Sequence, residues 1–308
     1  MAIIKPEALD FSEKSFCMVL SGQPGLGKTT LALSAPDPLL FDLDNGIARV
    51  RAEHRGLTTI NETYTDLLND MQTSEYKECK SVIIDTGGSL VQLMQPWAKT
   101  QDAKAARDGR AMYGVIKREF DRLTAQIRQD KKNCIIVFHT TETQKGDVTV
   151  TRLSCEGSSK DIVWTPADLG AHMFMMGQKR VIGFSPTEEY FAKSCFGISG
   201  IREVPTLKQG DKNDFLTRLF NEARENIAKD MEAFGPKRAT YDKAMKFGRA
   251  FIDGADDVNK LNLALEQIGS IEHALTSKKE LGSLLNAKAK ELGCKFSKEE
   301  GAYVQNNA

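Results

Sequence analysis

Short apolar segments alternate with segments of helical periodicity through the first two thirds of the chain. Along residues 114–129, apolar side chains recur every three or four positions, and this spacing predicts an amphipathic helix. Strands that alternate with helices predict an α/β fold, in which helices cover both faces of a mostly parallel sheet. The strands are predicted at 16–21, 38–44, 81–86, 133–140, 180–186 and 190–196, and the apolar segment 172–177 is interpreted as the core of a helix.

The pattern changes near residues 232–241, where Gly235 and Pro236 form a breaker. Only helical patterns follow it. In the last of them, Ser277 and Glu280 fit a capping box, and Gly293 is the predicted stop. The chain is therefore predicted to contain a core at 1–230 and a small all-α domain at 236–308.

Residues 21–30, SGQPGLGKTT, match the phosphate-binding motif G-x-x-x-x-G-K-[ST] letter for letter. The motif follows a predicted strand and opens a predicted helix that Pro36 must end. Glycines let backbone N–H groups converge on phosphate oxygens, and the helix N-terminus adds a favourable dipole. We expect Lys28 to bridge the terminal phosphates of ATP and the Thr29 hydroxyl to hold Mg²⁺. The predicted nucleotide-binding residues are Gly22, Gln23, Pro24, Gly25, Leu26, Gly27, Lys28, Thr29 and Thr30.

An acidic residue at the end of another strand must help to organise the magnesium ion. Asp85, which ends the segment SVIID, is the predicted Walker B aspartate and metal ligand, and a turn residue at the strand end is the alternative. Thr86 and two glycines follow it, so the carboxylate that orients water must come from elsewhere. Asp42 and Asp44, in FDLDNG, are the candidates, because alternation gives them the same facing near the phosphate end.

The composition restricts which binding partners and which cellular compartment are expected. Lys and Arg together number 42, as do Asp and Glu, so any nucleic-acid surface must be local. Six cysteines are scattered without a CxxC pair, which is typical of reduced thiols in a cytoplasm. No apolar run approaches the roughly 20 residues that span a bilayer, and the N-terminus lacks the pattern of a signal peptide. We expect a soluble, cytoplasmic protein without a membrane partner.

The segments GQPGLGKTT, LLFDLDNG, VIIDTGGSL and CIIVFHT occur in the order and approximate spacing of the RecA-fold recombinases, and the chain resembles that family over about residues 10–215. The resemblance implies a RecA-like P-loop NTPase core. It places Asp44 where the family has a catalytic glutamate, and His139 near the family's sensor glutamine. Both are departures, because aspartate is shorter and histidine titrates near neutral pH. A turn at Asp44 and a structural hydrogen bond at His139 are the alternatives.

More narrowly, the sequence resembles the phage-encoded AAA-type, RecA-fold ATPases of the Sak recombination group, in its fourth, ATP-binding class. PLLFDLDNG after a short first helix and the late segment ADLGAHMFMMG…RVIGFSP support the resemblance. It implies a minimal recombinase that acts on single-stranded DNA beside a single-strand DNA-binding protein, in the host cytoplasm if the protein is phage-encoded.

Three segments are candidates for contact with DNA. The resemblance implies two DNA-contacting loops, at 99–110 and 140–161, and VTVTRL in the second predicts a hairpin. A third basic segment, 236–249, opens the C-terminal domain. Solvated charged surfaces are the alternative for these segments, and core packing is the alternative for the aromatic residues of the third. The candidate residues are Lys99, Lys104, Arg107, Arg110, Lys145, Arg152, Lys160, Lys243 and Lys246.

RecA-like assemblies bind ATP between neighbouring subunits, and a basic residue of the next subunit then neutralises charge. Arg180 and Lys193 are the candidates for this role. The leading hypothesis is an ATPase that binds single-stranded DNA as an oligomer or filament and promotes annealing or strand exchange, with slow, DNA-stimulated hydrolysis. The alternatives are a helicase loader or helicase-like ATPase and a nucleotide-gated, non-enzymatic adaptor.

Overall fold

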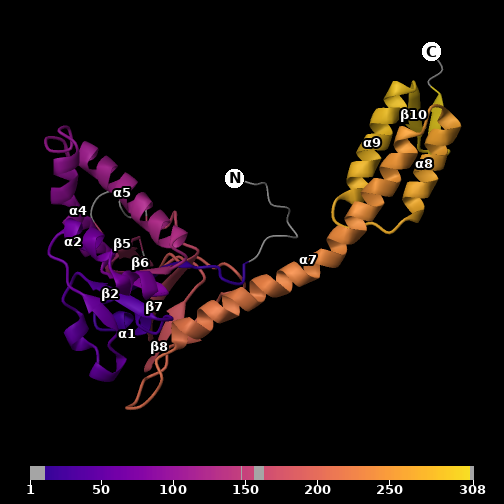
Figure 1. The fold of residues 1–308 in the computed structure, drawn as a ribbon. Coiled ribbons are helices and arrows are strands. Elements are labelled where there is room, and N and C mark those ends of the chain that lie inside the picture. The colour runs from indigo at the N-terminus through magenta and orange to yellow at the C-terminus, as the bar shows by residue number, and fades with distance from the viewer. Residues whose placement is uncertain (1–10, 147, 156–162, 306–308) are drawn as a thin grey trace. The chain divides into compact units, whose positions relative to one another are not determined.

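Figure 1 shows the computed structural model of the chain, which describes residues 11–146, 148–155 and 163–305. The described residues form two compact units, one that extends to Ile227 and one that begins at Ala228. The first unit, called the core below, contains the phosphate-binding motif. No helix in the described ranges has the length and apolar character needed to cross a membrane.

The core is built on one sheet with the strand order β3-β2-β4-β5-β1-β7-β8-β9, and β6 pairs with β5. The pairs from β3 to β7 are parallel, whereas β8 and β9 are antiparallel additions at one edge, and β6 forms a hairpin with β5. The predicted α/β class is confirmed, as is the hairpin. The strands are β1 (Cys17–Gly22), β2 (Pro38–Asp42), β3 (Leu57–Thr59), β4 (Ser81–Asp85), β5 (Asn133–Lys145), β6 (Val148–Leu153), β7 (Leu169–Met176), β8 (Lys179–Gly183) and β9 (Ile201–Glu203).

Alternation along β1 divides the interior into two apolar cores. Cys17 and Val19 face a core that includes the apolar sides of α4 and α5, whereas Met18 and Leu20 face the core that contains α1 and the start of α7. Because β1 lies inside the sheet, between β5 and β7, it is buried along its whole length. The core helices are α1 (Lys28–Ala32), α2 (Tyr64–Asp70), α3 (Ser74–Glu78), α4 (Gly87–Gln101), α5 (Gly109–Gln129) and the first part of α7 (Phe215–Asp253), with two 3₁₀ turns at Ile47–Arg49 and Ala52–His54.

Two predictions at the late edge of the sheet are wrong. The segment 172–177, interpreted as helix core, lies in β7, because a short apolar run fits a buried strand as well as a buried helix. The segment 190–196, predicted as a strand, forms only an isolated bridge between Lys193 and Gly170. β9 occupies the free edge of β8, and the segment pairs only through Lys193, with a part of β7 that β8 does not cover.

The second unit consists of the end of α7, α8 (Val258–Ser270), α9 (Ser277–Glu291) and a hairpin of β10 (Cys294–Ser297) and β11 (Ala302–Gln305). The predicted helical region is present, but the hairpin corrects its all-α description. Its apolar core includes Leu261, Leu281 and Tyr303, the last from the hairpin.

Helix α7 also corrects the predicted breaker, because it continues through Gly235 and Pro236. Proline removes one backbone donor and its ring clashes with the Cβ of the residue before it. Gly235 has no Cβ and both residues are exposed, which reduces that clash and leaves the neighbouring carbonyl open to water.

Candidate nucleotide-binding site

The phosphate-binding loop connects the carboxyl end of β1 to α1, as predicted. Gly22 is required by a close approach, because an ideal Cβ there would lie 2.6 Å from the carbonyl oxygen of Met173. Gly27 precedes α1 with a φ of 86°, in the left-handed region that favours glycine. The loop backbone therefore takes a form that only these residue types allow, at a helix N-terminus that attracts anions.

Lys28 lies in the loop with only 4 % of its surface exposed. Its Nζ donates to the carbonyl oxygen of Gln23 at 2.8 Å and lies 3.2 Å from Nδ1 of His139. Burial lowers the pKa of Lys28 to about 8, although the carboxylates of Asp85 and Asp44 partly oppose this shift. The ammonium group thus lies next to a backbone carbonyl, the His139 ring and two carboxylates, at the place where anionic phosphates are expected.

Asp85 ends β4, with β5 between it and β1. The Thr29 hydroxyl donates to Oδ2 of Asp85 at 2.6 Å. Burial raises the pKa of Asp85, and the hydrogen bond from Thr29 opposes the shift. One hydroxyl and one carboxylate fit Mg²⁺, which keeps several waters and takes its other ligands from substrate phosphates. The two predicted metal ligands are in contact, and their role stays a prediction.

Asp44 and His139 meet beside Lys28. Oδ2 of Asp44 lies 3.6 Å from Nε2 of His139, and the Ser89 hydroxyl donates to the other carboxylate oxygen. The neighbouring His139 ring is the main cause that holds the pKa of Asp44 below its usual value. His139 therefore links the lysine to the aspartate. All four predicted catalytic residues, Lys28, Asp44, Asp85 and His139, lie in one connected group, and their catalytic roles stay predictions.

Asp42, the other candidate carboxylate, has a local structural role. Its two oxygens accept the backbone N–H groups of Gly46 and Ile47 at 2.7 and 2.9 Å. These bonds close the turn after β2, in which Asn45 has a φ of 51°. The turn that was the alternative for Asp44 thus exists, and it holds Asp44 at the edge of the site.

The two candidates for a finger from a neighbouring subunit differ in position. Arg180, on β8, lies against the loop of its own chain, because an ideal Cβ on Gly27 would lie 2.9 Å from the Arg180 Nη1. Lys193 donates to the carbonyl oxygen of Ala167 and bridges Gly170, which pairs with Val19 in the middle of β1 rather than at its phosphate end. This arrangement favours a role for Arg180 at its own nucleotide site. A role across a subunit boundary stays a prediction for both residues.

The DNA candidates lie on three surfaces. The first is the connection between α4 and α5, where Lys99, Lys104, Arg107 and Arg110 are all exposed. None of these four side chains has an ion-pair partner among the described residues. On the second surface, Arg152 is exposed on β6 opposite Thr141. Lys145 is the last residue of β5, and its side chain is not among those that the structure describes. Lys160 lies outside the described residues.

The third surface lies on α7. Lys243, Lys246 and Phe247 are exposed and line a groove of about 620 Å³, together with Ala250 and Ile271. The Phe247 ring packs on Phe251, with 4.8 Å between the ring centroids. Phe247 therefore contacts its own helix and also lines the groove.

Sequence reasoning missed several groups next to the loop. Ser89 bonds to Asp44, and Gln23 donates to Glu142 on the β5–β6 hairpin. His172 lies behind the loop with its Nδ1 3.1 Å from the Ser21 hydroxyl, and burial lowers its pKa to about 4. Gln23 was predicted to bind nucleotide, but Ser89, Glu142 and His172 were assigned no role, and the only signal for His172 was a polar residue inside an apolar run.

Comparison with known proteins identifies the core. A family model described as an AAA domain matches residues 14–196. Among solved structures, the chain is similar to a KaiC-like protein, PH0186, from Pyrococcus horikoshii OT3, with 13 % identity, a TM-score of 0.38 and coverage of 62 % of this chain and 90 % of that one. It is also similar to the flagellar accessory protein FlaH from Methanocaldococcus jannaschii, with 14 % identity, a TM-score of 0.30 and coverage of 54 % and 75 %. A search of curated proteins finds no match.

Proposed function

The chain belongs to the AAA domain family, with a RecA-like P-loop ATPase core, and from this premise we propose that it is an ATP-dependent, single-stranded DNA-binding recombination protein. It binds DNA as an oligomer or filament and promotes annealing or strand exchange, and ATP acts mainly as a switch. A single-strand DNA-binding protein is the expected partner. The resemblance to the Sak group of phage ATPases motivates the assignment to recombination.

One observation supports DNA binding most directly, namely the excess of positive charge around the α4–α5 connection. Six basic side chains in and around it are exposed, and none forms an ion pair or a side-chain hydrogen bond with another described residue. Asp102 and Asp108 are the acids of residues 99–118 and keep their charge, so the six basic residues leave an excess of four positive charges. Free cations of this density suit a phosphate backbone. The six are Lys99, Lys104, Arg107, Arg110, Lys117 and Arg118.

Helix α4 offers a physical route between nucleotide and DNA. It begins at Gly87, two residues after Asp85, and its 15 residues extend about 22 Å to the basic connection. Its first turn includes Ser89, which bonds to Asp44, and Thr86 caps the helix. A change in the contacts of Asp44 or Asp85 would therefore act on the helix whose other end bears Lys99.

The residues of the site have distinct parts in this proposal. Lys28 and the loop N–H groups bind the phosphates, and Thr29 and Asp85 hold Mg²⁺, which supplies charge neutralisation when it is bound. Asp44 orients or deprotonates the attacking water, with His139 fixing its carboxylate. Bound ATP favours the DNA-binding state, and slow hydrolysis releases it.

The proposal is tested by ATP hydrolysis with and without single-stranded DNA, at low and moderate salt, with Lys28→Ala as the blank. We expect stimulation that weakens with salt and is absent in the blank. In the double variant Arg107→Ala/Arg110→Ala, stimulation should fall severalfold. The slope of log DNA affinity against log salt should become shallower by about 1.4, because two phosphate contacts are lost.

The matched control is Lys77→Ala/Lys229→Ala, which removes two exposed cations from α3 and α7 without touching the α4–α5 connection. It should hydrolyse ATP and bind DNA as the wild type does. The assignment to this surface would be refuted if DNA did not change ATP turnover. It would also be refuted if the control lost as much DNA stimulation as the double variant. Strand separation by hexameric rings would instead favour the helicase alternative.

A further inference from the structure

The groove of about 620 Å³ on α7 lies entirely within the second unit. Figure 1 shows this end of α7 beside α8 and α9. The other wall of the groove is formed by Ile271 and Glu272, in the connection between α8 and α9. Pockets that enclose a small ligand measure about 300 to 1,000 Å³, so the groove can hold several side chains. None of its described lining residues belongs to the nucleotide site.

Helix α7 has two apolar faces at this end, and the bundle core uses one of them. Gly248 and Ile252 face the core, where an ideal Cβ on Gly248 would lie 2.6 Å from the Leu281 side chain. Phe247 and Ala250 lie on the neighbouring face, and 40 % of Phe247 is exposed. An exposed apolar face with polar residues at its rim, beside a core that is already packed, indicates a surface for a partner.

The lining residues of α7 form a stripe along the helix. Thr240, Lys243, Phe247 and Ala250 recur every three or four positions, so they share one face. The helix rises about 15 Å from the first to the last of them, and an extended chain covers that length with about five residues. Side chains two positions apart in an extended chain point the same way. Two apolar side chains of one segment can therefore enter the groove together.

Positive charge surrounds the apolar stripe. Residues 237–249 contain five basic residues and one acid, Asp242. Asp242 forms an ion pair with Arg238 at 3.2 Å, whereas the exposed Lys243 and Lys246 form none within the described part of the chain. The groove is therefore complementary to a partner that combines apolar side chains with net negative charge.

The lining favours a protein segment over single-stranded DNA. Sites for single strands combine cations with aromatic faces on which successive bases stack. Phe247 is the one aromatic residue among the described lining residues, and its ring already packs on Phe251. Ala250 and Ile271 add aliphatic surface. A nucleic acid carries a phosphate at every step and would place one near Glu272, whereas a peptide can present a backbone N–H group there.

We propose that this groove is a docking site for a protein partner that presents a short, extended, acidic segment with two apolar side chains. The apolar side chains enter between Phe247 and Ile271, and the flanking carboxylates lie against Lys243 and Lys246. Burial of the apolar groups supplies affinity, and the lysines supply orientation and specificity. The proposal assigns these two lysines to a protein contact instead of DNA. It is independent of the ATPase and of the DNA surface on the α4–α5 connection.

The test is fluorescence anisotropy of labelled peptides mixed with the full chain. The first probe is Asp-Asp-Phe-Asp-Phe-Asp-Asp, whose two aromatic side chains point the same way when it is extended. In the second probe serine replaces both phenylalanines, and in the third lysine replaces every aspartate. We expect saturable binding of the first probe, at least about 10-fold weaker binding of the second, and no binding of the third. Affinity for the first probe should fall as salt rises.

The apolar part of the groove is tested by Ala250→Trp. Because Ala250 is exposed, the new side chain fills the groove without entering the bundle core, and affinity for the first probe should fall at least about 10-fold. Ala287→Trp, at an exposed alanine of α9 that does not line the groove, is the matched control. It should leave affinity within about twofold of the wild type.

The charged part is tested by Lys243→Glu/Lys246→Glu, which should also weaken the first probe at least about 10-fold. Its control is Lys295→Glu/Lys298→Glu, which makes the same change of net charge at two exposed lysines away from the groove lining. The control should stay within about twofold of the wild type. Glu272→Gln removes the carboxylate of the groove wall and should tighten binding about twofold.

The proposal is overturned if the first probe shows no saturable binding, if the first two probes bind equally, or if the controls lose as much affinity as the groove variants. Two other occupants have distinct signatures, and either would overturn it as well. Labelled oligo-dT that loses affinity in Ala250→Trp, without peptide binding by the wild type, would assign the groove to DNA. A mass by light scattering that falls in Ala250→Trp but not in Ala287→Trp would assign it to a second copy of the chain.

Discussion

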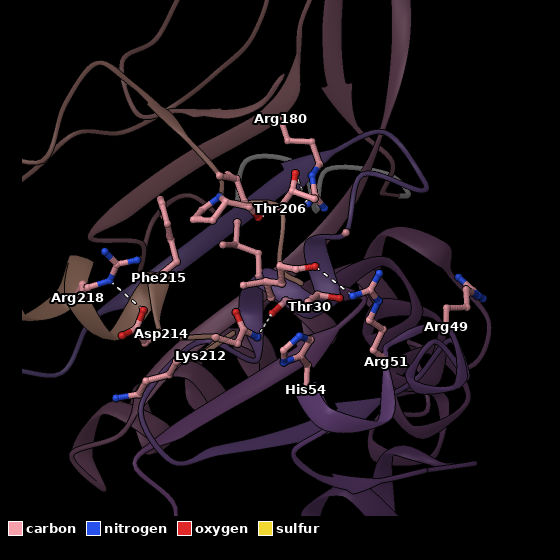
Figure 2. A pocket seen from close by; sticks show the side chains of 16 residues that line it. Thr30, Arg49, Arg51, His54, Arg180, Thr206, Lys212, Asp214, Phe215 and Arg218 are labelled. Carbon is pink, nitrogen blue, oxygen red and sulfur yellow. Dashed lines mark hydrogen bonds and ion pairs between the residues drawn. The ribbon is translucent and has the colours of Figure 1, made fainter. Parts of the chain in front are cut away.

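The two ends of the proposed nucleotide site differ in how their polar groups are satisfied. At the phosphate end, Lys28 bonds to Gln23, Thr29 to Asp85 and Asp44 to Ser89. At the cavity of about 240 Å³ that adjoins Gly27 and Thr30 (Figure 2), the exposed side chains of Arg49 and Lys212 form no ion pair within the described residues.

The difference indicates two sources of binding free energy. A ligand at the phosphate end must exchange existing bonds for new ones, so its net gain depends on stronger, charge-assisted contacts. A ligand in that cavity would meet Arg49 and Lys212 without breaking an ion pair within the described residues. Substitutions at the first end should thus affect every triphosphate, whereas substitutions at the second should affect only nucleotides.

Lys28→Ala should produce the largest effect. Removing the ammonium group abolishes hydrolysis and weakens ATP and inorganic triphosphate by the same factor, about 100-fold, because two or more charge-assisted contacts are lost. Titration of both ligands measures the two factors, with Lys77→Ala as the control for an exposed lysine. A much larger loss of affinity for ATP than for triphosphate would show that the two ends of the site do not bind independently.

Asp44→Asn should have the next largest effect. It keeps the shape of the side chain but removes the charge that would orient water, so turnover should fall about 100-fold while ATP affinity changes less than about twofold. Steady-state hydrolysis and titration separate the two quantities. Asp44→Glu, which restores the length seen in the resembled family, should raise turnover at unchanged affinity. If neither substitution changes turnover, Asp44 has no catalytic role.

The pH dependence of binding should give the smallest effect. The pKa of Lys28 is lowered to about 8, and phosphates require the charged form. Binding therefore takes up a proton above pH 8, and affinity falls as pH rises. From pH 7.5 to 9, triphosphate affinity should fall about 8-fold at constant ionic strength, as titration would measure. Lys28→Arg, which stays charged, should flatten the profile. A similar fall in Lys28→Arg would assign the titration to another group.

The local parts of the fold follow from the sequence because their signals lie within a few residues. The motif at 21–30 lies between β1 and α1, Asp85 ends β4, and the alternating VTVTRL segment forms the hairpin strand β6. Each of these features depends on neighbours along the chain, such as glycine conformation, strand alternation or a strand end.

Longer-range context decided the elements that were predicted wrongly. Residues 190–196 have strand-like composition, but β9 already occupies the edge of β8. Residues 172–176 form a strand because β8 pairs with all of them and β1 pairs with the first two. Helix α7 passes Pro236 because Gly235 leaves room for the ring and the site is exposed.

The sequence by itself determined that this protein has a phosphate-binding loop with a lysine, a hydroxyl and a distant strand-end aspartate, since these follow from a contiguous motif and an apolar run. Only the tertiary structure decided that Asp44 and His139 meet beside Lys28, and that Gly27, His54 and Arg180 line one cavity. The physical reason is that these residues come from separate elements, and their distances depend on strand order and on the turn after β2. No local pattern of side chains encodes that order.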